Sequence, residues 1–515
     1  MPWSATRTRR TISCKHATTS GGPLPDPTTP GRRGRRPRPV QHRLLVLVIC
    51  CSSLFVVGLD STIVIIALPA IGRSLHGGVS GLQWTIDGYT LVLASLLMFA
   101  GATADRVGRR RVFMTGLTVF TAGSALCSLA PGLGWLIAFR MTQAVGGSML
   151  NPVAMSIIAN TFTERAERAR AIGIWGGAYG LSMALGPVAG GLLVDFVGWR
   201  GAFWVNIPFG IAALALTARF VPESRAPRAR RPDPAGQGFI IVMLGSLTYA
   251  IIEGPGRGWG SPLILCLFVV SAAALAALVA YESRRAEPVL DPRFFRSAPL
   301  SGAVLTAILA AGSLAGGLLL ATLYLQDVRA LSALKAGLYL APMALTLAAG
   351  AVVSGRVLAR YGARPPMLGA GAATAAGGVL LSMLTMPSPA AVVVAGLAVF
   401  GLGNGLANAP ITNAAVSGMP DAQAGVASGI ASTSRQVGQS LGIAITGSIL
   451  AAGLHHGPLR TGFVGASHPA WLVLAGCGAA VVLLGLVTTG RWARTTVTRT
   501  AALLALAEAA VRPPT

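Results

Sequence analysis

Charged residues are scarce in this chain, and most of those present carry one sign. Of its 515 residues 53% are hydrophobic and only 11% are charged, yet the net charge is +25. Lysine is almost missing, because Lys15 and Lys335 are the only two. An ordinary soluble globular domain holds about a quarter charged residues. The composition therefore excludes that class of protein and favours one that lies in a membrane.

Recognisable catalytic, metal and nucleotide motifs are missing as well. Five of the six cysteines fall inside apolar runs without disulfide or metal spacing. No Gly-x-x-x-x-Gly-Lys-Ser/Thr loop is present, which disfavours transport driven by ATP. The histidines His455, His456 and His468 have no acidic or cysteine companions. We therefore expect no enzyme, no cofactor and no metal site.

Long apolar runs dominate what is present. A helix needs about 20 apolar residues to cross a bilayer, and fourteen segments meet that need. They are 44–71, 82–104, 112–131, 134–160, 170–196, 199–221, 238–254, 262–281, 299–326, 336–358, 366–386, 390–415, 424–453 and 469–490. The predicted fold class is an all-α polytopic membrane protein with fourteen transmembrane helices.

The arginines give these segments an orientation. Clusters follow the second, fourth, sixth, eighth and tenth segments, whereas the loops between them hold few basic residues. The clusters are Arg106, Arg109, Arg110 and Arg111; Arg165, Arg168 and Arg170; Arg225, Arg228, Arg230 and Arg231; Arg284, Arg285, Arg293 and Arg296; and Arg360 and Arg364. Short basic loops stay in the cytoplasm, and both tails are basic. We expect both termini in the cytoplasm and no binding of nucleic acid, since the charge lies in loops and tails.

One loop sequence occurs twice. Gly101-Ala-Thr-Ala-Asp105-Arg106-Val-Gly108-Arg109-Arg110 follows the second segment, and Gly355-Arg-Val-Leu-Ala-Arg360-Tyr-Gly362-Ala-Arg364 follows the tenth. Two six-helix repeats would place the second copy after the eighth segment, so two extra helices separate the halves. The predicted domains are a disordered basic tail, 1–42; a six-helix bundle, 43–221; two linker helices, 222–297; a second six-helix bundle, 298–490; and a cytoplasmic tail, 491–515.

Further motifs agree in order and spacing with one known family. They are Leu59-Asp60-Ser-Thr62, Gln83-Trp84-Thr-Ile-Asp87, Phe139-Arg140-Met-Thr-Gln143, Gly186-Pro187-Val-Ala-Gly190-Gly191 and Ser434-Arg435-Gln436. Together with the repeated loop they resemble the fourteen-helix drug:proton antiporter group of the major facilitator superfamily. The chain departs from the family pattern at Ile65, Thr103 and Ala144, where Asn, Leu and Gly are usual.

The resemblance implies an activity. It points to proton-coupled efflux of drugs, antibiotics or other amphiphilic small molecules across the bacterial plasma membrane, by alternating access between two bundles. The implied partners are a small-molecule substrate, protons and the lipid bilayer, and we expect a monomer. One alternative is a dedicated exporter of an endogenous metabolite or self-made antibiotic on the same fold. An uncoupled channel or receptor is a further alternative.

Three charged residues within apolar segments are candidates for proton coupling. Asp60 is costly to keep ionised in an apolar helix, which would let it exchange protons near neutral pH. Arg140 cannot lose its charge and needs a partner, and the resemblance links its position to proton transfer. Asp87 lies near the outer end of its segment, where water or a headgroup could satisfy it. Each of these residues could instead have a structural role.

The remaining candidates concern the cavity and conformational change. Gln143, Arg435 and Gln436 could line a substrate cavity or only bridge helices. The loop after the second segment would be a conformational switch that favours one conformer. The resemblance makes the Gly-Pro-containing motif of the fifth segment an antiporter motif, which would seal or bend the contact between the halves. These residues are Gly101, Asp105, Arg106, Gly108, Arg109 and Arg110 for the loop, and Gly186, Pro187, Gly190 and Gly191 for the antiporter motif. Plain topology and small-residue packing are the competing interpretations.

Overall fold

The computed structural model is helical throughout the part of the chain that it describes. The described residues are 40–226, 233–285, 291–417, 424–454, 459–490, 492–493, 495–500 and 502. No strand occurs among them, so the predicted all-α class is confirmed. The predicted tail 1–42 lies almost wholly outside the described residues, as does the larger part of the predicted tail 491–515.

Each predicted apolar segment falls on a helix. The helices are α1 (Val40–Leu75), α2 (Val79–Val107), α3 (Arg109–Ser128), α4 (Leu133–Thr161), α5 (Arg165–Val197), α6 (Gly201–Trp204), α7 (Asn206–Phe220), α8 (Pro234–Arg257), α9 (Pro262–Glu282), η1 (Pro292–Arg296), α10 (Ala298–Leu323), η2 (Tyr324–Val328), α11 (Ala333–Tyr361), α12 (Arg364–Ser382), α13 (Ala390–Ser417), α14 (Ala424–Leu454) and α15 (Leu459–Thr488). The segment predicted at 199–221 is divided between α6 and α7, and α15 begins ten residues before its predicted start at 469.

Eleven of the spans formed by these helices are both long and apolar enough to cross a membrane. The helices α3, α4 and α12 are not among them, although they are 20, 29 and 19 residues long. No stretch of these three helices is apolar enough: three arginines open α3, Arg140 lies inside α4, and α12 is rich in glycine and alanine. The number of transmembrane helices therefore stays a prediction.

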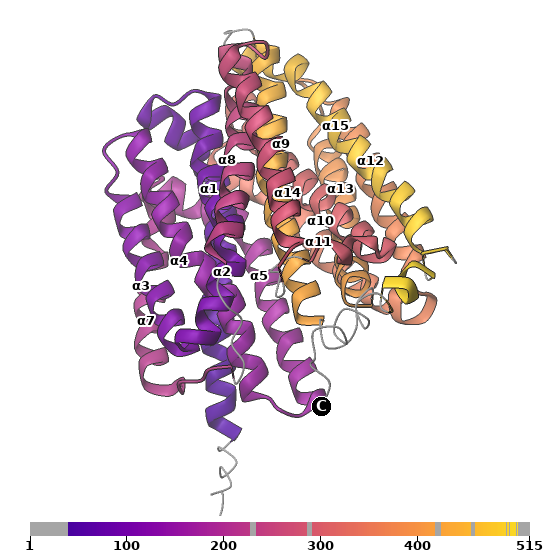
Figure 1. Cartoon of the computed structure of the whole chain (residues 1–515). Coiled ribbons are helices and arrows are strands. Elements are labelled where there is room, and N and C mark those ends of the chain that lie inside the picture. Colours follow the sequence, from indigo (N-terminus) through magenta and orange to yellow (C-terminus); the bar gives the residue numbers. More distant parts are fainter. Residues whose placement is uncertain are drawn as a thin grey trace, which may run out of the picture. The chain divides into compact units, whose positions relative to one another are not determined.

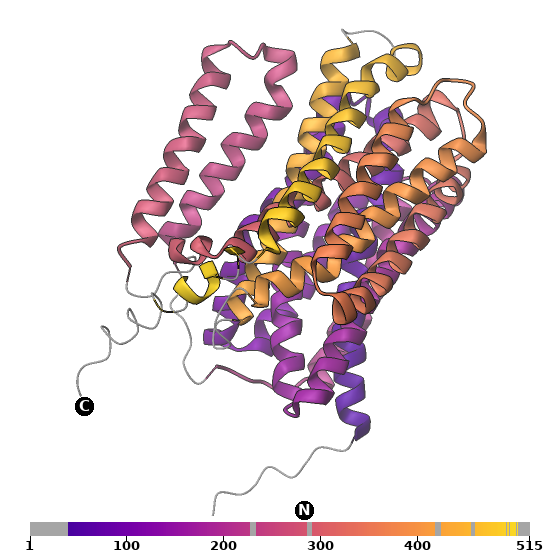
Figure 2. The same ribbon diagram turned by 90° about the vertical axis from the view of Figure 1, so that its right-hand side faces the viewer.

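The helices of Gln41–Thr515 pack as two groups and a hairpin (Figure 1). In the N-terminal group, α1–α7, helix α4 packs on α2 and α3. In the C-terminal group, α10–α15, helix α13 packs on α11 and α12, while α10 packs on α14. The hairpin α8–α9 stands at one side of both groups (Figure 2), and its α8 packs on α2 and on α14. The hairpin therefore lies over the seam where the two groups meet.

Two helix pairs close this seam. Helix α5 packs along α11 and α2 packs along α14. Gly191 of α5 lies against the backbone at Ala333, and Gly337 of α11 lies against the carbonyl of Pro187, so a Cβ atom at either glycine would collide with backbone. A hydrophobic core that includes Ile63 of α1 and Leu340 of α11 spans the two groups at the same end. Small residues thus allow the groups to touch closely.

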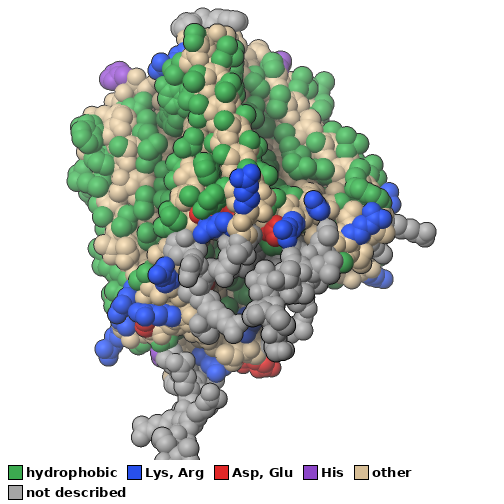
Figure 3. All heavy atoms as spheres, viewed as in Figure 1, with side chains coloured by type: hydrophobic (Ala, Val, Ile, Leu, Met, Phe, Trp, Pro, Cys, Tyr) green, Lys and Arg blue, Asp and Glu red, His purple; other side chains and the backbone are tan. Residues whose placement is uncertain are grey.

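The opposite end of the seam is open along α5. Gly173, Gly176, Gly177 and Gly180 lie in the first half of α5, and no atom of another described segment comes within 4 Å of a Cβ atom built at any of them. This is the end at which the arginine-rich loops lie. Figure 3 shows Lys and Arg side chains gathered below a broad hydrophobic band. We call this the basic end and the other the closed end.

Candidate functional site

A fully buried ion pair lies in the N-terminal group. Nη1 of Arg140 on α4 lies 2.6 Å from Oδ2 of Asp60 on α1. The two side chains are 1% and 0% exposed. Removing two charges from water is costly unless each is paired and hydrogen-bonded. The structure thus brings together two of the three residues predicted for proton coupling.

Two side-chain amides complete the surroundings of the Asp60 carboxylate. Its Oδ1 accepts hydrogen bonds from Nδ2 of Asn206 at 2.7 Å and from Nε2 of Gln143 at 3.0 Å. Both amides also donate to Oγ of Ser124, at 3.3 and 2.7 Å, and Oε1 of Gln143 accepts from Nη1 of Arg140 at 2.7 Å. Helices α1, α3, α4 and α7 therefore meet at one buried polar cluster, which we call the Asp60 cluster.

Aromatic rings hold the Arg140 guanidinium. Its central carbon lies 4.0 Å from the ring centre of Tyr89 and 5.7 Å from that of Phe203. Its Nε donates to the carbonyl of Thr85 at 3.4 Å. A desolvated cation on a ring face gains roughly 2 kcal/mol or more. The ring faces of Tyr89 and Phe203 thus stabilise the Arg140 cation in addition to Asp60.

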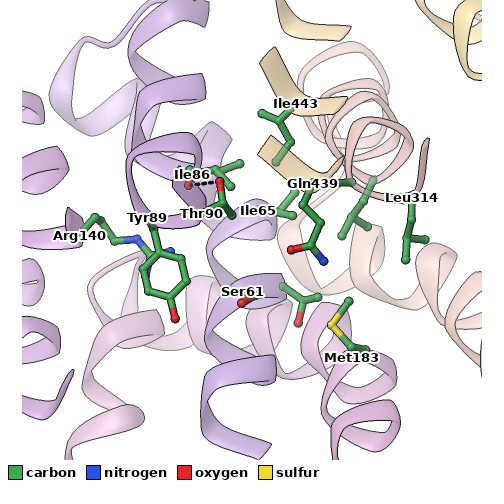
Figure 4. Close-up of a pocket in the computed structure, with 13 residues that line it drawn as sticks. Ser61, Ile65, Ile86, Tyr89, Thr90, Arg140, Met183, Leu314, Gln439 and Ile443 are labelled. Atoms are coloured by element: carbon green, nitrogen blue, oxygen red, sulfur yellow. Dashed lines mark hydrogen bonds between the residues drawn. The ribbon is translucent and has the colours of Figure 1, made fainter. Parts of the chain in front are cut away.

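A cavity borders the Asp60 cluster at the seam (Figure 4). Arg140 and Tyr89 form part of its wall on the side of the N-terminal group, while Leu314 and Gln439 face them from α10 and α14. The space in it that a water-sized molecule can occupy is about 30 Å³, which is room for only a few water molecules. The full lining is Ser61, Thr62, Ile65, Ile86, Tyr89, Thr90, Arg140, Met183, Leu314, Ala315, Leu318, Gln439 and Ile443.

The predicted cavity residues lie in different places. Gln143 lies behind Arg140 and binds Asp60, so it does not belong to the lining of this cavity. Arg435 donates from Nη2 to Oγ1 of Thr412 at 2.9 Å within the C-terminal group. The lining includes Gln439, one turn beyond Arg435, and neither Arg435 nor Gln436.

The environment predicted for Asp87 is wrong. Its side chain is fully buried, although the sequence suggested contact with water or headgroups near a helix end. Oγ1 of Thr90 lies 3.5 Å from its Oδ1, and Oδ2 has no hydrogen-bond partner among the described residues. Asp87 lies on the stretch of α2 that packs on α14 and α8, beside a small gap lined by Thr248 and Ser440. Neighbouring helices, not solvent, surround this carboxylate.

The predicted switch loop binds the chain just after α7. Arg109 pairs with Asp105 through Nη2 at 2.8 Å and Nε at 3.0 Å. Oε1 of Glu223 accepts from the backbone N of Arg110 at 3.1 Å. It lies only 2.7 Å from the place of a Cβ atom at Gly108, whose φ is 130°, so only glycine fits there. This loop joins α2 and α3 to the segment after α7, all within the N-terminal group. Gly101 lies on α2 near Pro152, and Arg106 is exposed.

The glycines of the predicted antiporter motif all lie at helix contacts. Gly186 faces Thr62 of α1, Gly190 faces Ile63 of α1, and Gly191 faces Ala333 of α11. Pro187 presents its carbonyl to Gly337 of α11. The motif therefore occupies the place where α5 meets both its own group and the other one.

Four functional candidates were missed by sequence reasoning. Asn206 and Ser124 belong to the Asp60 cluster, and Tyr89 and Gln439 line the cavity. Asn206 is the only polar side chain within 201–216, a signal that could have identified it. Ser124 and Tyr89 carry no such signal, because a single hydroxyl in a helix can bond its own backbone. No cluster of metal-ligating side chains occurs among the residues that the structure describes.

Comparison with known proteins agrees with this arrangement. A family model described as Major Facilitator Superfamily matches residues 50–443. The multidrug resistance protein Stp of Mycobacterium tuberculosis (strain CDC 1551 / Oshkosh) is 39% identical over 412 residues, which cover 80% of this chain and 76% of Stp. The tetracenomycin C resistance and export protein of Streptomyces glaucescens is 37% identical over 422 residues, covering 81% and 77%.

A solved structure shares the fold. The inward-facing, unoccupied form of a bacterial homologue of the human lysosomal transporter Spinster superposes with a TM-score of 0.63. It covers 90% of this chain and 99% of its own, at 16% sequence identity. At that identity the similarity concerns the arrangement of helices alone.

Proposed function

Because this chain belongs to the Major Facilitator Superfamily, we propose that it exports amphiphilic small molecules, drugs or antibiotics among them, in exchange for protons. The chain is a multi-pass membrane transporter of small molecules and not an enzyme. Its relatives include proteins named for multidrug resistance and antibiotic export. The proposal adds the proton, its binding residue and the direction of transport.

The observation that carries the proposal is the Asp60–Arg140 pair beside the cavity. With Asp60 ionised the pair has no net charge, and with Asp60 protonated its net charge is +1. Arg140 itself lines the cavity, so a proton on Asp60 changes the charge presented to a bound molecule. A ligand shifts a two-state equilibrium only through its different affinity for the two states. Protonation at Asp60 supplies such a difference without direct contact between proton and substrate.

Asp87 is the second proposed proton site. It is a fully buried carboxylate in the seam, and no described basic side chain forms an ion pair with it. Relative motion of α2 and α14 would change its surroundings, which is the property that a coupling residue needs. Arg435 and Gln436 would contact substrate nearer the basic end, below Gln439.

The proposed orientation places the basic end in the cytoplasm of a bacterial cell, with both termini there. The open stretch of α5 then faces the cytoplasm and the closed end faces outward. In this conformer a molecule would enter from the cytoplasm, and opening of the closed end would release it outside. The switch loop would stabilise one conformer at the basic end, and the antiporter motif would seal the other end.

The proposed architecture has fourteen transmembrane helices in two six-helix bundles, 43–221 and 298–490, with two inserted helices in 222–297. Adding α3, α4 and α12 to the eleven apolar spans gives fourteen. These three helices pack against other helices of their own group, α3 on α4 and α12 on α13 and α15. Such packing would let less apolar helices remain in the membrane. We expect the transporter to act as a monomer.

Proton release from acid-loaded inverted vesicles tests the proposal. Lipophilic drugs and antibiotics are added one at a time to vesicles that hold the full-length protein. We expect release with at least one compound, and its loss in Asp60→Asn. Asp233→Asn is the matched control, because it also removes a carboxylate paired with an arginine but lies far along the chain at the start of α8. Full activity of Asp60→Asn would overturn the proton assignment.

A dedicated exporter of one metabolite is the second candidate. The Streptomyces relatives named for single antibiotics favour it. Proton release with one compound and none with its structural neighbours would support a dedicated exporter. A response to several unrelated compounds would support multidrug efflux.

A further inference from the structure

The contact between α5 and α11 ends in a helix cap that crosses from one group to the other. Oδ1 of Asp195 on α5 accepts a hydrogen bond from the backbone N of Ala333, and Oδ2 accepts one from the backbone N of Leu334, both at 3.0 Å. Ala333 and Leu334 are the first two residues of α11. One carboxylate of the N-terminal group therefore binds the start of a helix of the C-terminal group.

Such a cap stabilises the helix that receives it. The first N–H groups of a helix have no partner within the helix, and its N-terminus attracts negative charge. The third N–H group of α11 has a local partner, because Oγ of Ser332 accepts from the N of Lys335 at 3.3 Å. The start of α11 thus has one cap from its own chain neighbourhood and one from the other group.

The two caps respond differently to relative motion of the groups. If the groups separate at the closed end, Ser332 moves with α11 and keeps its bond. Asp195 moves with α5, so both of its bonds are lost and the N–H groups turn to water. The close approach at Gly191 and Gly337 places α5 and α11 in contact just before the cap. The Asp195 bonds therefore exist only while the closed end is closed.

We propose that Asp195 is a latch that favours the conformer closed at this end. The inference rests on the proposed alternating-access function and goes beyond it, since it assigns a residue outside the motifs discussed above. Removal of an N-cap side chain costs about 0.5 to 2 kcal/mol. At about 1.4 kcal/mol for each factor of ten, loss of the latch would raise the ratio of open to closed conformers at this end by about two- to thirty-fold.

Distance measurements between the groups test the latch. Spin labels are placed at Trp204 on α6 and Val392 on α13, both exposed and near the closed end, in full-length protein with its six cysteines replaced. Pulsed electron resonance without added substrate then gives the populations of short and long distances. We expect Asp195→Ala to raise the long population as stated, and Asp195→Asn to raise it less, because one amide oxygen remains.

Ser332→Ala is the matched control, since it removes the cap of the same helix that does not cross groups. It should lower the thermal stability without raising the long population. The same rise with Ser332→Ala would overturn the latch, as would unchanged populations in both Asp195 variants. The distance measurement involves neither protons nor substrate gradients. A failure of antiport in vesicles would therefore not change the distance populations, and unchanged populations in the Asp195 variants would not argue against antiport.

Discussion

Leaving Arg140 without Asp60 costs more free energy than leaving Asp60 without Arg140. A buried carboxylate that loses its cation can take up a proton and become neutral. An arginine cannot lose its charge under any ordinary condition. The rings of Tyr89 and Phe203 compensate only part of the cost of an unpaired guanidinium. The pair is therefore more sensitive to loss of the acid than of the base.

This asymmetry gives a prediction for stability. Asp60→Asn should destabilise the protein by about 3 to 5 kcal/mol, because a buried cation is left unpaired. Arg140→Gln should cost less, and Asp60→Asn/Arg140→Gln should cost less than the two single changes added together. The measurement is the thermal unfolding of purified protein in detergent, followed by tryptophan fluorescence. Equal, additive effects of the two single changes would contradict the prediction.

The sequence was sufficient for part of this cluster. Asp60 and Arg140 could be predicted because a lone charge in an apolar segment requires a reason. Asn206 and Ser124 could not, since short polar side chains in helices are often satisfied locally. The surroundings of Asp87 were also out of reach. Its neighbour Ser440 lies more than 350 positions further along the chain, and no local pattern indicates that α14 and α8 cover this carboxylate.

At the scale of single elements, hydrogen bonds from α8 connect the α8–α9 hairpin to α2 of the N-terminal group. Oε1 of Glu253 near its end accepts from Oγ of Ser80 at 2.9 Å and from Nε1 of Trp84 at 3.0 Å. Near its start, Gln237 donates to the carbonyl of Ser95. Both ends of α8 are thus bonded to α2. We expect the hairpin to follow the N-terminal group when the groups move.

The start of α8 gives a prediction for pH dependence. The pKa of Asp233 is lowered overall, although burial by itself would raise it. The lowering comes from the hydrogen bond of the Gly236 backbone N–H, the ion pair with Arg285 and the hydroxyl of Tyr281. A carboxyl group whose pKa is lowered in the folded state stabilises the protein at pH values above its pKa in the unfolded chain, about 3.9. This stabilisation is lost as the pH falls through the pKa of the folded state. Asp233→Asn should therefore be about 1 to 2 kcal/mol less stable at pH 7.

Thermal unfolding at several pH values measures this difference. The gap between wild type and Asp233→Asn should be constant above about pH 5 and shrink below about pH 4. Asp291→Asn is a suitable control, because Asp291 caps the short helix η1 on the same stretch of loops. A gap that persists unchanged into strong acid would contradict the assignment.

The helices were largely predictable, whereas their docking was not. The pair Asp233-Pro234 is a known start signal, since Asp favours the cap and Pro the first turn, and fourteen apolar runs of sufficient length could be read directly. The division between α6 and α7 left no local mark. The partners of α8 on α2 and α14 depend on three segments distant in sequence, so only the structure reveals that the extra helices cover the seam.

At the scale of the whole described chain, the seam is closed at one end and open at the other. The closed end has polar contacts between the groups besides the latch. Gln83 donates to the carbonyl of Ala444 at 3.0 Å, Gln326 donates to that of Ile66 at 2.8 Å, and Arg73 pairs with Asp327 at 3.1 Å. These bonds would all break if the closed end opened. The second conformer must therefore gain comparable contacts at the basic end, where Asp105 and its neighbouring arginines lie.

Reactivity of single thiols along α5 tests this asymmetry. Gly177→Cys lies in open space near the basic end, and Ala189→Cys packs into the core that crosses the groups. A membrane-impermeant maleimide should therefore modify Gly177→Cys in inverted vesicles, in which the basic end faces outward. When an open conformer makes up about a tenth of the population or less, a thiol at Ala189→Cys should react at least about tenfold more slowly. A compound that favours opening of the closed end should slow the first reaction and speed the second. If both thiols react at similar rates, the two ends do not open alternately, and there is no closed conformer for Asp195 to favour.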